Sequence, residues 1–367
     1  MGFYDKYSLY KNFNFENFYI NVKDSDIENV LRKDKLNEID LLTLLSPSAE
    51  KYLEKIATKA NEISVKQFGK TILLYTPIYI SNFCRNVCSY CSFSLRNKID
   101  RKQLTLDEIK EEAKAIYENG IRHILILTGE DKIKTHISYL KDCIRVLKQY
   151  FDSISIEIYA LDEKEYRELI NEGVDGLTIY QEVYNEQMYS KVHISGDKKN
   201  YKYRLDAPER ACRQNIRFVN LGVLLGLYDW RSEVFFMGLH GKYLQNKYSH
   251  VEISFSFPRI RPFIGSNFKP YKVTDKNLVQ SILALRLYIP RAGINISTRE
   301  NALFRDKIIP LGVTKMSAGV STQVGGYSLD NKGVSQFDIC DTRSVEQVKK
   351  AIISAGYQPV FKDWMII

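Results

Sequence analysis

The chain has 367 residues, 44% of them hydrophobic, a length and composition that suit a globular protein with one large α/β domain and extensions. Its six cysteines do not resemble a secreted disulfide framework, and the N-terminus lacks an apolar signal-peptide core. With no run of about 18 apolar residues anywhere, we expect a soluble cytoplasmic protein that does not span a membrane.

The formal net charge is +9, which raises the question of a nucleic-acid partner. The lysines are spread along the whole chain, however, and no recognition-helix, RNP or zinc-finger pattern accompanies them. We therefore expect a solvated basic surface and no nucleic-acid binding. The electrostatic field of this positive charge could still attract an acidic protein, such as an electron donor.

Residues 1–70 are predicted to form a helical extension. Asp24-Ser25-Asp26 is typical of a helix start, and we expect a short helix from there to Lys33. Ser46-Pro47-Ser48 predicts a second helix, because proline at the first helical position is pre-organised for it. Apolar residues at helical spacing continue that helix over residues 49–64.

From residue 71 onward, strand-like apolar runs alternate with amphipathic helical stretches. Strands are predicted at residues 71–80, 121–127, 153–160, 173–180, 217–226, 250–257, 293–297 and 312–317. Helices are predicted at residues 105–119, 132–150, 162–171, 207–215, 232–245 and 275–288. Thr105-x-x-Glu108 is a capping-box start for the first of these, and Asn119-Gly120 is a typical helix end.

This alternation predicts βαβ units and a parallel sheet. Eight strands favour a closed (β/α)8 barrel over an open doubly wound sheet, and no GxGxxG follows the first strand. We expect residues 71–325 to form the barrel and residues 326–367 to form a C-terminal segment packed on it. The glycine-punctuated stretch 319–327 is interpreted as a flexible closing loop.

Three cysteines with the spacing C-x3-C-x2-C, Cys84, Cys88 and Cys91, follow the first predicted strand. Three thiolates from one loop suit a four-iron cluster that keeps one iron open for a substrate or cofactor. A structural zinc site normally closes with four protein ligands. A zinc knuckle completed by a distant ligand, or simple buried thiols, remain alternatives. The remaining cysteines, Cys143, Cys212 and Cys340, are isolated in sequence and are expected to be ordinary buried thiols.

Active sites of such barrels lie at the C-terminal ends of the strands, so the cysteine loop is expected at the barrel mouth. The second strand ends in Thr128-Gly129-Glu130, the third carries Glu157 and the fourth ends in Tyr180-Gln181-Glu182. A carboxylate in an apolar strand needs a polar cavity or a paired cation, and ribose hydroxyls would suit Glu157. A plain turn at Gly129 and structural salt bridges of the glutamates are the alternatives.

Two arginines follow later strands, Arg261 after the sixth and Arg299 after the seventh, and Ser317 ends the eighth. Arginine binds carboxylates with a rigid two-donor fork, so each is a candidate clamp for an amino-acid substrate. An Arg–Glu ion pair at the barrel rim is the alternative for both.

With Tyr90 before its third cysteine, the cysteine pattern resembles the signature of the radical S-adenosylmethionine (SAM) enzymes. In that family the open iron chelates SAM, and one electron from the cluster cleaves it to a 5′-deoxyadenosyl radical. The chain also resembles the 2-iminoacetate synthases, the ThiH-type tyrosine lyases of thiazole and thiamine biosynthesis. That likeness is carried by residues 44–47, 79–84, 91–94, 127–130, 180–182, 297–300, 325–327 and 358–364.

The resemblance implies cleavage of the Cα–Cβ bond of L-tyrosine to 2-iminoacetate (dehydroglycine) and p-cresol through a 5′-deoxyadenosyl radical. It implies a [4Fe–4S] cluster on Cys84, Cys88 and Cys91. It implies SAM contacts at Tyr90, Thr128, Gly129 and Glu130, and substrate contacts at Tyr79 and Arg299. From their places at the strand ends, Glu157, Gln181 and Glu182 are further candidates for SAM contacts, and Arg261 and Ser317 for substrate contacts. The implied partners are a ThiG-type thiazole synthase, in complex, and a flavodoxin- or ferredoxin-type electron donor.

Related readings remain open at this point. A tryptophan lyase shares the radical core, and the residues facing the ring cannot be identified from the sequence. The hydrogenase-maturation tyrosine lyase adds a C-terminal domain with its own cluster. We do not expect that domain here, because only Cys340 lies in the last hundred residues. A non-catalytic iron–sulfur or zinc module is the alternative from a different class.

Overall fold

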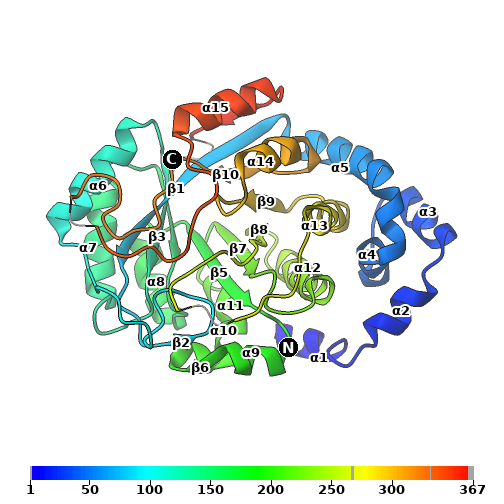
Figure 1. Cartoon of the computed structure of the whole chain (residues 1–367), viewed down its shortest axis with the longest axis horizontal. Coiled ribbons are helices and arrows are strands. Elements are labelled where there is room, and N and C mark those ends of the chain that lie inside the picture. Colours follow the sequence, from blue (N-terminus) through cyan, green and yellow to red (C-terminus); the bar gives the residue numbers. More distant parts are fainter. Residues whose placement is uncertain (1, 266–267, 331, 363–367) are drawn as a thin grey trace.

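In the computed structural model, which describes residues 2–265, 268–330 and 332–362, eight parallel strands close into a barrel (Figure 1). The predicted (β/α)8 architecture is confirmed, and each predicted strand has its counterpart. The barrel strands are β1 (Thr71–Ser81), β3 (His123–Thr128), β4 (Ser153–Glu157), β5 (Gly176–Glu182), β7 (Phe218–Val223), β8 (Glu252–Ser256), β9 (Gly293–Ile296) and β10 (Lys315–Ser317).

The long strand β1 closes the barrel. Its residues Leu73–Tyr75 pair with β10, whereas Thr76 and the residues after it pair with β3. A further parallel strand, β11 (Gln358–Val360), pairs with the first residues of β1 outside the barrel. The C-terminal segment is thereby joined to the strand that leads into the cysteine loop.

Helices surround the barrel and cover its outer face. They are α6 (Leu106–Glu118), α7 (Ile137–Leu147), α8 (Glu163–Glu172), α9 (Glu186–Val192), α10 (Tyr201–Leu205), α11 (Ala207–Cys212), α12 (Trp230–Lys247), α13 (Asp275–Tyr288), α14 (Ala302–Ile308) and α15 (Val345–Ser354). Thr105 and Glu108 form the predicted capping box of α6, and Gly120, at φ +88°, follows its end. Short 3-10 turns lie at Asp197–Lys199 and Ile309–Leu311.

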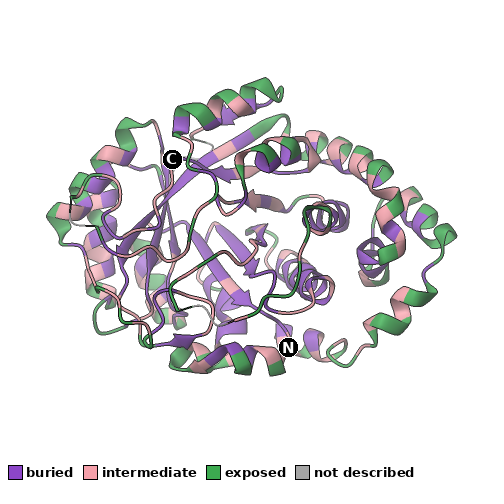
Figure 2. Cartoon of the chain, in the orientation of Figure 1, coloured by how far each residue is buried: buried purple, intermediate pink, exposed green. Residues whose placement is uncertain are grey.

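The N-terminal extension curves around one flank of the barrel, beside α12 and α13 (Figure 1). It consists of α1 (Phe3–Ser8), α2 (Phe15–Asn21), α3 (Asp24–Arg32), α4 (Glu38–Leu45), a 3-10 helix (Pro47–Tyr52) and α5 (Leu53–Phe68). Because α1, α4 and α5 cover them, α12 and α13 are buried on nearly every side (Figure 2). A helix that is apolar all round needs such a cover.

Several boundaries differ from the prediction. Helix α7 begins at Ile137 and not at residue 132, because Asp131 accepts the backbone N–H groups of Ile133 and Lys134 and folds a turn there. The second N-terminal helix starts as a 3-10 helix capped by Ser46 before α5 begins at Leu53. None of the described helices is long and apolar enough to cross a membrane.

Candidate active site

A cavity opens at the C-terminal ends of the barrel strands and holds about 760 Å³ of space that protein atoms do not fill, part of it open to solvent. Its walls combine apolar and aromatic groups with a few charged ones, as expected of a ligand site. They are Tyr75, Pro77, Tyr79, Tyr90, Cys91, Leu125, Leu127, Glu157, Tyr180, Glu182, Leu224, Pro258, Ser297, Thr298, Arg299, Ser317, Val320, Thr322, Gln336 and Phe337.

The cysteine loop leaves β1 and is held at this mouth by a buried polar scaffold. Arg101 donates from Nη1 to the carbonyl oxygens of Asn82 (2.7 Å) and Phe93 (2.8 Å), so it ties both ends of the loop. The Asn82 side chain accepts from the backbone N–H of Lys102 at 2.7 Å. Cys88 lies in the short strand β2 (Val87–Cys88), which pairs with β6 (His193–Ser195). These contacts hold the loop through groups other than the cysteine thiols.

All three cysteines are free thiols: Cys88 is buried, and Cys84 and Cys91 are half-buried. Burial raises the pKa of Cys84 to about 11. Burial is also the main reason why the pKa of Cys91 is raised. Such thiols need a strong local positive charge to become thiolates, and a bound iron atom supplies it. Within residues 2–265, 268–330 and 332–362, no group of three or more His, Cys, Asp or Glu is arranged to hold a single metal ion. Three cysteines on one loop are a donor set that suits an iron–sulfur cluster.

Gly129 brings the end of β3 against the cysteine loop. A Cβ atom built on Gly129 would lie 2.3 Å from the carbonyl oxygen of Phe83, the residue before Cys84. The Gly129 N–H also donates to the Ser81 carbonyl oxygen at 2.8 Å. At this glycine the end of β3 is therefore in direct contact with the backbone of the cysteine loop.

A buried ion network lies beside the cavity and contains two cations that the sequence interpretation missed. Arg204 donates to Glu130 at 2.9 Å, and Lys198 contacts Glu182 at 2.8 Å and Glu130 at 3.7 Å. Burial opposes ionisation of Glu130, but Arg204 and Lys198 outweigh it and lower the pKa of this carboxyl. Glu182 reaches Lys198 from a left-handed backbone conformation, φ +67°, at a register shift in β5.

Tyr90 is hydrogen-bonded to His193, another residue that the sequence analysis did not single out. Its hydroxyl lies 2.7 Å from His193 Nε2, and His193 Nδ1 lies 2.9 Å from the Tyr189 carbonyl oxygen. Burial, followed by the charge of Lys198, holds the pKa of His193 well below its usual range. The imidazole is therefore neutral, donates from Nδ1 and accepts a hydrogen bond from the Tyr90 hydroxyl at Nε2, which fixes the ring of Tyr90.

Arg299 points its guanidinium into the cavity. Its Cζ lies 3.3 Å from the ring centroid of Phe337, which stacks on the guanidinium plane. Among the described residues, this side chain has no hydrogen-bond acceptor or ion-pair partner. Burial, followed by repulsion from Glu182, raises the pKa of the nearby Glu157 carboxyl to about 7.

The structure brings most of the predicted site residues together. Six of them line the cavity beside Cys91: Tyr79, Tyr90, Glu157, Glu182, Arg299 and Ser317. Glu130 lines a neighbouring cavity with Lys198 and Arg204. Thr128 and Gln181 are buried next to the strand ends, and the Thr128 hydroxyl and the Gln181 amide nitrogen have no hydrogen-bond partner among the described residues.

Arg261 does not line the cavity. Its Nη2 lies 2.9 Å from Glu300 Oε2, and Arg259 contacts the same carboxylate. Arg261 is thus held in the rim ion pair that the sequence left as an alternative. Gln336 and Phe337, in contrast, line the cavity although no local sequence signal marks them.

Comparisons with known proteins agree with this architecture. The family model described as the Radical SAM superfamily matches residues 78–235, and the one described as the Biotin and Thiamin Synthesis associated domain matches residues 256–358. The first of these matches contains the cysteine loop and the ion network of Glu130.

Similar proteins cover nearly the whole chain. The 2-iminoacetate synthase of Escherichia coli (strain K12) is 40% identical over 342 residues, which span 93% of this chain and 90% of the relative. The crystal structure of HydG, a maturase of the [FeFe]-hydrogenase, has a TM-score of 0.88 at 29% identity and covers 95% of this chain and 79% of HydG. HydG from Carboxydothermus hydrogenoformans has a TM-score of 0.87 at 31% identity, over 95% of this chain and 84% of that one. The chain therefore belongs to the radical SAM superfamily and, within it, to the family of the 2-iminoacetate synthases.

Proposed function

We propose that the chain is a radical SAM lyase that cleaves the Cα–Cβ bond of L-tyrosine to 2-iminoacetate and p-cresol. The observation that carries this proposal is the guanidinium of Arg299, which has no hydrogen-bond acceptor or ion-pair partner among the described residues and lines the same cavity as Cys91. A half-buried guanidinium without an ion-pair partner favours an anionic ligand, and the carboxylate of an amino acid fits its two-donor fork.

Enzymes of this superfamily use a [4Fe–4S] cluster and SAM, and the cluster supplies the electron that cleaves SAM to a 5′-deoxyadenosyl radical. We assign Cys84, Cys88 and Cys91 to the cluster. Tyr90, held by His193, forms a wall of the cavity for the adenosyl group. Glu157 and Glu182 line the same cavity and are proposed to accept hydrogen bonds from SAM hydroxyl or amino groups.

The ion network of Glu130 supports the same end of the site. Arg204 and Lys198 hold Glu130 ionised, so this carboxylate stays an acceptor, and Lys198 also contacts Glu182 at 2.8 Å. Thr128, Gly129 and Gln181 are proposed to act beside them, with Gly129 setting the distance between β3 and the cysteine loop.

On the substrate side, Arg299 would bind the tyrosine carboxylate, and the stacked ring of Phe337 would hold the guanidinium plane in place. Tyr79 and Ser317 would contact the end of the tyrosine that carries its amino and carboxylate groups. The amino group, from which a hydrogen atom is abstracted, would then lie near Cys91. The aromatic walls, among them Tyr75 and Tyr180, suit a phenol ring. We assign Arg261 to the rim ion pair with Glu300 and not to the substrate.

Two partners and a domain division belong to this proposal. A reductant is required, and we propose a flavodoxin- or ferredoxin-type protein that docks on the basic surface. We also propose a ThiG-type thiazole synthase that takes up the unstable imine.

Residues 1–70, 71–325 and 326–367 are proposed as extension, barrel and C-terminal segment.

An anaerobic product assay tests the function. Reconstituted protein is mixed with SAM, a reductant and L-tyrosine, and the products are read by mass spectrometry. Deoxyadenosine, p-cresol and glyoxylate (the hydrolysed imine) are expected. Deoxyadenosine without p-cresol would overturn the tyrosine assignment, and L-tryptophan in place of tyrosine then tests the tryptophan-lyase alternative.

The similarity to HydG favours a second candidate, a tyrosine lyase of hydrogenase maturation. Both would form p-cresol, so the partner decides between them. Co-purification with thiazole synthase, and transfer of the imine to it, are expected for the first candidate. A failure of thiazole synthase to bind or to use the product would favour the second.

A further inference from the structure

Gln336 lies between the substrate side of the cavity and the cysteine loop. Its Oε1 accepts from the Tyr79 hydroxyl at 2.8 Å, and its Nε2 lies 3.8 Å from the Sγ atom of Cys91. One amide therefore contacts both a residue at the proposed amino-acid end and a proposed cluster ligand. It comes from the C-terminal segment, more than 240 residues away in sequence from Cys91.

The backbone on both sides of this amide is fixed. The Gln336 N–H donates to the Thr322 carbonyl oxygen at 3.2 Å, and the Gln336 carbonyl accepts from the N–H of Ser92 at 3.3 Å. Ser92 directly follows Cys91, so the segment is hydrogen-bonded to the cysteine loop itself. The Thr322 hydroxyl donates to the Phe337 carbonyl oxygen at 3.0 Å, which holds the next residue as well.

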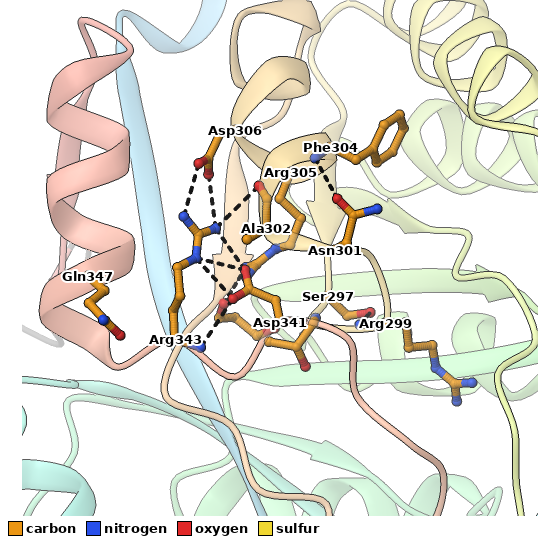
Figure 3. Close-up of polar contacts among 12 residues, drawn as sticks. Ser297, Arg299, Asn301, Ala302, Phe304, Arg305, Asp306, Asp341, Arg343 and Gln347 are labelled. Atoms are coloured by element: carbon orange, nitrogen blue, oxygen red, sulfur yellow. Dashed lines mark hydrogen bonds and ion pairs between the residues drawn. The ribbon is translucent and has the colours of Figure 1, made fainter.

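A few residues later, an ion cluster anchors the same segment to the barrel. The N–H groups of Cys340 and Asp341 both donate to the Thr298 carbonyl oxygen, at 2.9 and 3.1 Å. The Asp341 carboxylate contacts Arg305 and Arg343, while the side chain of Arg299 extends away from this cluster (Figure 3). The position of Gln336 is thus set by contacts independent of its side chain.

The orientation of the amide follows from its neighbours. Burial holds the pKa of Tyr79 well above its usual range, so its hydroxyl stays protonated and can donate to Oε1. A cluster-bound thiolate is an acceptor only, so the NH₂ group is the end of the amide that suits Cys91. Both contacts are satisfied by one orientation, and the alternative would place Oε1 against a negative sulfur.

We propose that Gln336 is a positioning residue that donates an N–H···S hydrogen bond to the Cys91 thiolate and thereby raises the reduction potential of the cluster. Hydrogen bonds to the sulfurs are one of the factors that set such potentials. Reduction adds a negative charge to the cluster, and a donor aimed at Cys91 Sγ stabilises that charge. The inference rests on the cluster and not on the identity of the amino acid that is cleaved.

A potentiometric titration tests this without SAM or amino acid. The cluster is reconstituted anaerobically in the wild type, Gln336→Leu, Gln336→Glu and Gln149→Leu, and the reduced form is followed by its electron paramagnetic resonance signal. Gln336→Leu removes the donor, and Gln336→Glu replaces it by an oxygen while it keeps an acceptor for Tyr79. Gln149 is exposed and serves as the matched control for a Gln→Leu change.

At a fixed applied potential, we expect about a tenfold lower ratio of reduced to oxidised cluster in both Gln336 variants, which corresponds to ~59 mV for one electron. Gln149→Leu should match the wild type. Unchanged ratios in the Gln336 variants at full iron content would overturn the proposal. Loss of iron from both, with Gln149→Leu loaded, would overturn it too, because it would make Gln336 a requirement for assembly. Either result leaves the lyase assignment untouched, since no substrate is present.

Discussion

Arg299 and Arg261 both follow barrel strands, but their surroundings give them different roles. Arg299 stacks on Phe337 and has no acceptor in the described structure, whereas Arg261 is paired with Glu300. We predict that Arg299→Lys raises the KM for tyrosine at least about tenfold, because lysine keeps the charge but loses the fork and the stacking. Steady-state p-cresol formation measures this.

Arg261→Gln is the control for that prediction. Glu300 keeps its contact with Arg259 in this variant, so the KM should stay within about threefold of the wild type. Cluster content, read from iron and absorbance, should be unchanged in both variants. A larger effect at Arg261 than at Arg299 would reverse the assignment.

Glu157 predicts a pH dependence of stability. Its pKa rises from 4.5 in the unfolded chain to about 7 in the folded protein, chiefly by burial. Between these values the unfolded state releases the proton and the native state keeps it, so this contribution to stability falls as the pH rises. Above pH 7 the native carboxylate is charged at a cost of up to about 3 kcal/mol.

Glu157→Gln removes that cost. The free energy of unfolding of the cluster-free variant, relative to the wild type, should therefore increase between pH 5 and pH 8. Urea denaturation at the two pH values measures the difference. Glu111→Gln, at an exposed position, should follow the wild type at both. A difference that does not change with pH would contradict the argument.

Whether a residue of the site could be predicted depends on how far away in sequence its partners lie. Cys84, Glu157 and Arg299 could be predicted because each follows or ends a recognisable strand, and strand ends of a barrel meet at one mouth. Lys198 and Phe337 could not. Lys198 lies in a short 3-10 turn and Phe337 on an irregular segment, and only the folded chain brings them to Glu182 and Arg299.

At the level of elements, the contact between β3 and the cysteine loop leaves no room for a side chain at position 129. A methyl group at position 129 has no room, since Phe83 O lies 2.3 Å from the ideal Cβ position. We predict that Gly129→Ala lowers the iron bound per chain severely, because the loop must move, and destabilises the protein by about 1–3 kcal/mol. Iron content and denaturant unfolding measure the two effects.

Gly69→Ala separates loop displacement from loss of stability. Gly69 has φ +65° and open space around its Cβ position, so the change costs backbone strain of about 1–3 kcal/mol but displaces nothing. It should bind iron like the wild type. Equal iron loss in both variants would mean that instability, and not the position of the cysteine loop, is responsible.

Elements were predictable in proportion to their length and periodicity. The barrel strands and the helices α6 and α13 carry regular apolar patterns, and their ranges agree within a few residues with the prediction. Strands β2, β6 and β11 have two or three residues each, too few to show a period. Their existence depends on partners distant in sequence, such as the pairing of Cys88 with His193.

On the scale of the whole molecule, the segments outside the barrel contribute both to the hydrophobic core and to the cavity wall. The N-terminal helices cover α12 and α13, which would otherwise expose apolar sides. The C-terminal segment adds β11 to β1 and places Gln336 and Phe337 in the cavity wall. Stability and site geometry are therefore coupled through the anchors of that segment.

The ion cluster at Asp341 tests this coupling. Asp341 and Arg305, which lie side by side in Figure 3, have fully buried side chains. The Arg305 guanidinium also donates to the Ser317 carbonyl oxygen. Asp341→Ala leaves a buried arginine uncompensated, which should cost about 3–5 kcal/mol of unfolding free energy. The KM for tyrosine should rise with it, because the segment that carries Gln336 and Phe337 loses one of its anchors to the barrel.

Two further variants show whether the buried charge or the loss of the segment's anchor is responsible. Asp306→Ala removes the partly exposed partner of Arg343 and should cost less than about 1 kcal/mol, with the KM unchanged. Arg305→Met combined with Asp341→Leu replaces the buried pair by apolar groups and should recover most of the stability. If the double variant regains stability but keeps the raised KM, the ion pair itself positions the cavity wall. If both recover, packing of the segment is sufficient, and the charges serve only to neutralise each other. A loss below about 1 kcal/mol in Asp341→Ala would show that the segment is held elsewhere, and the coupling would fail.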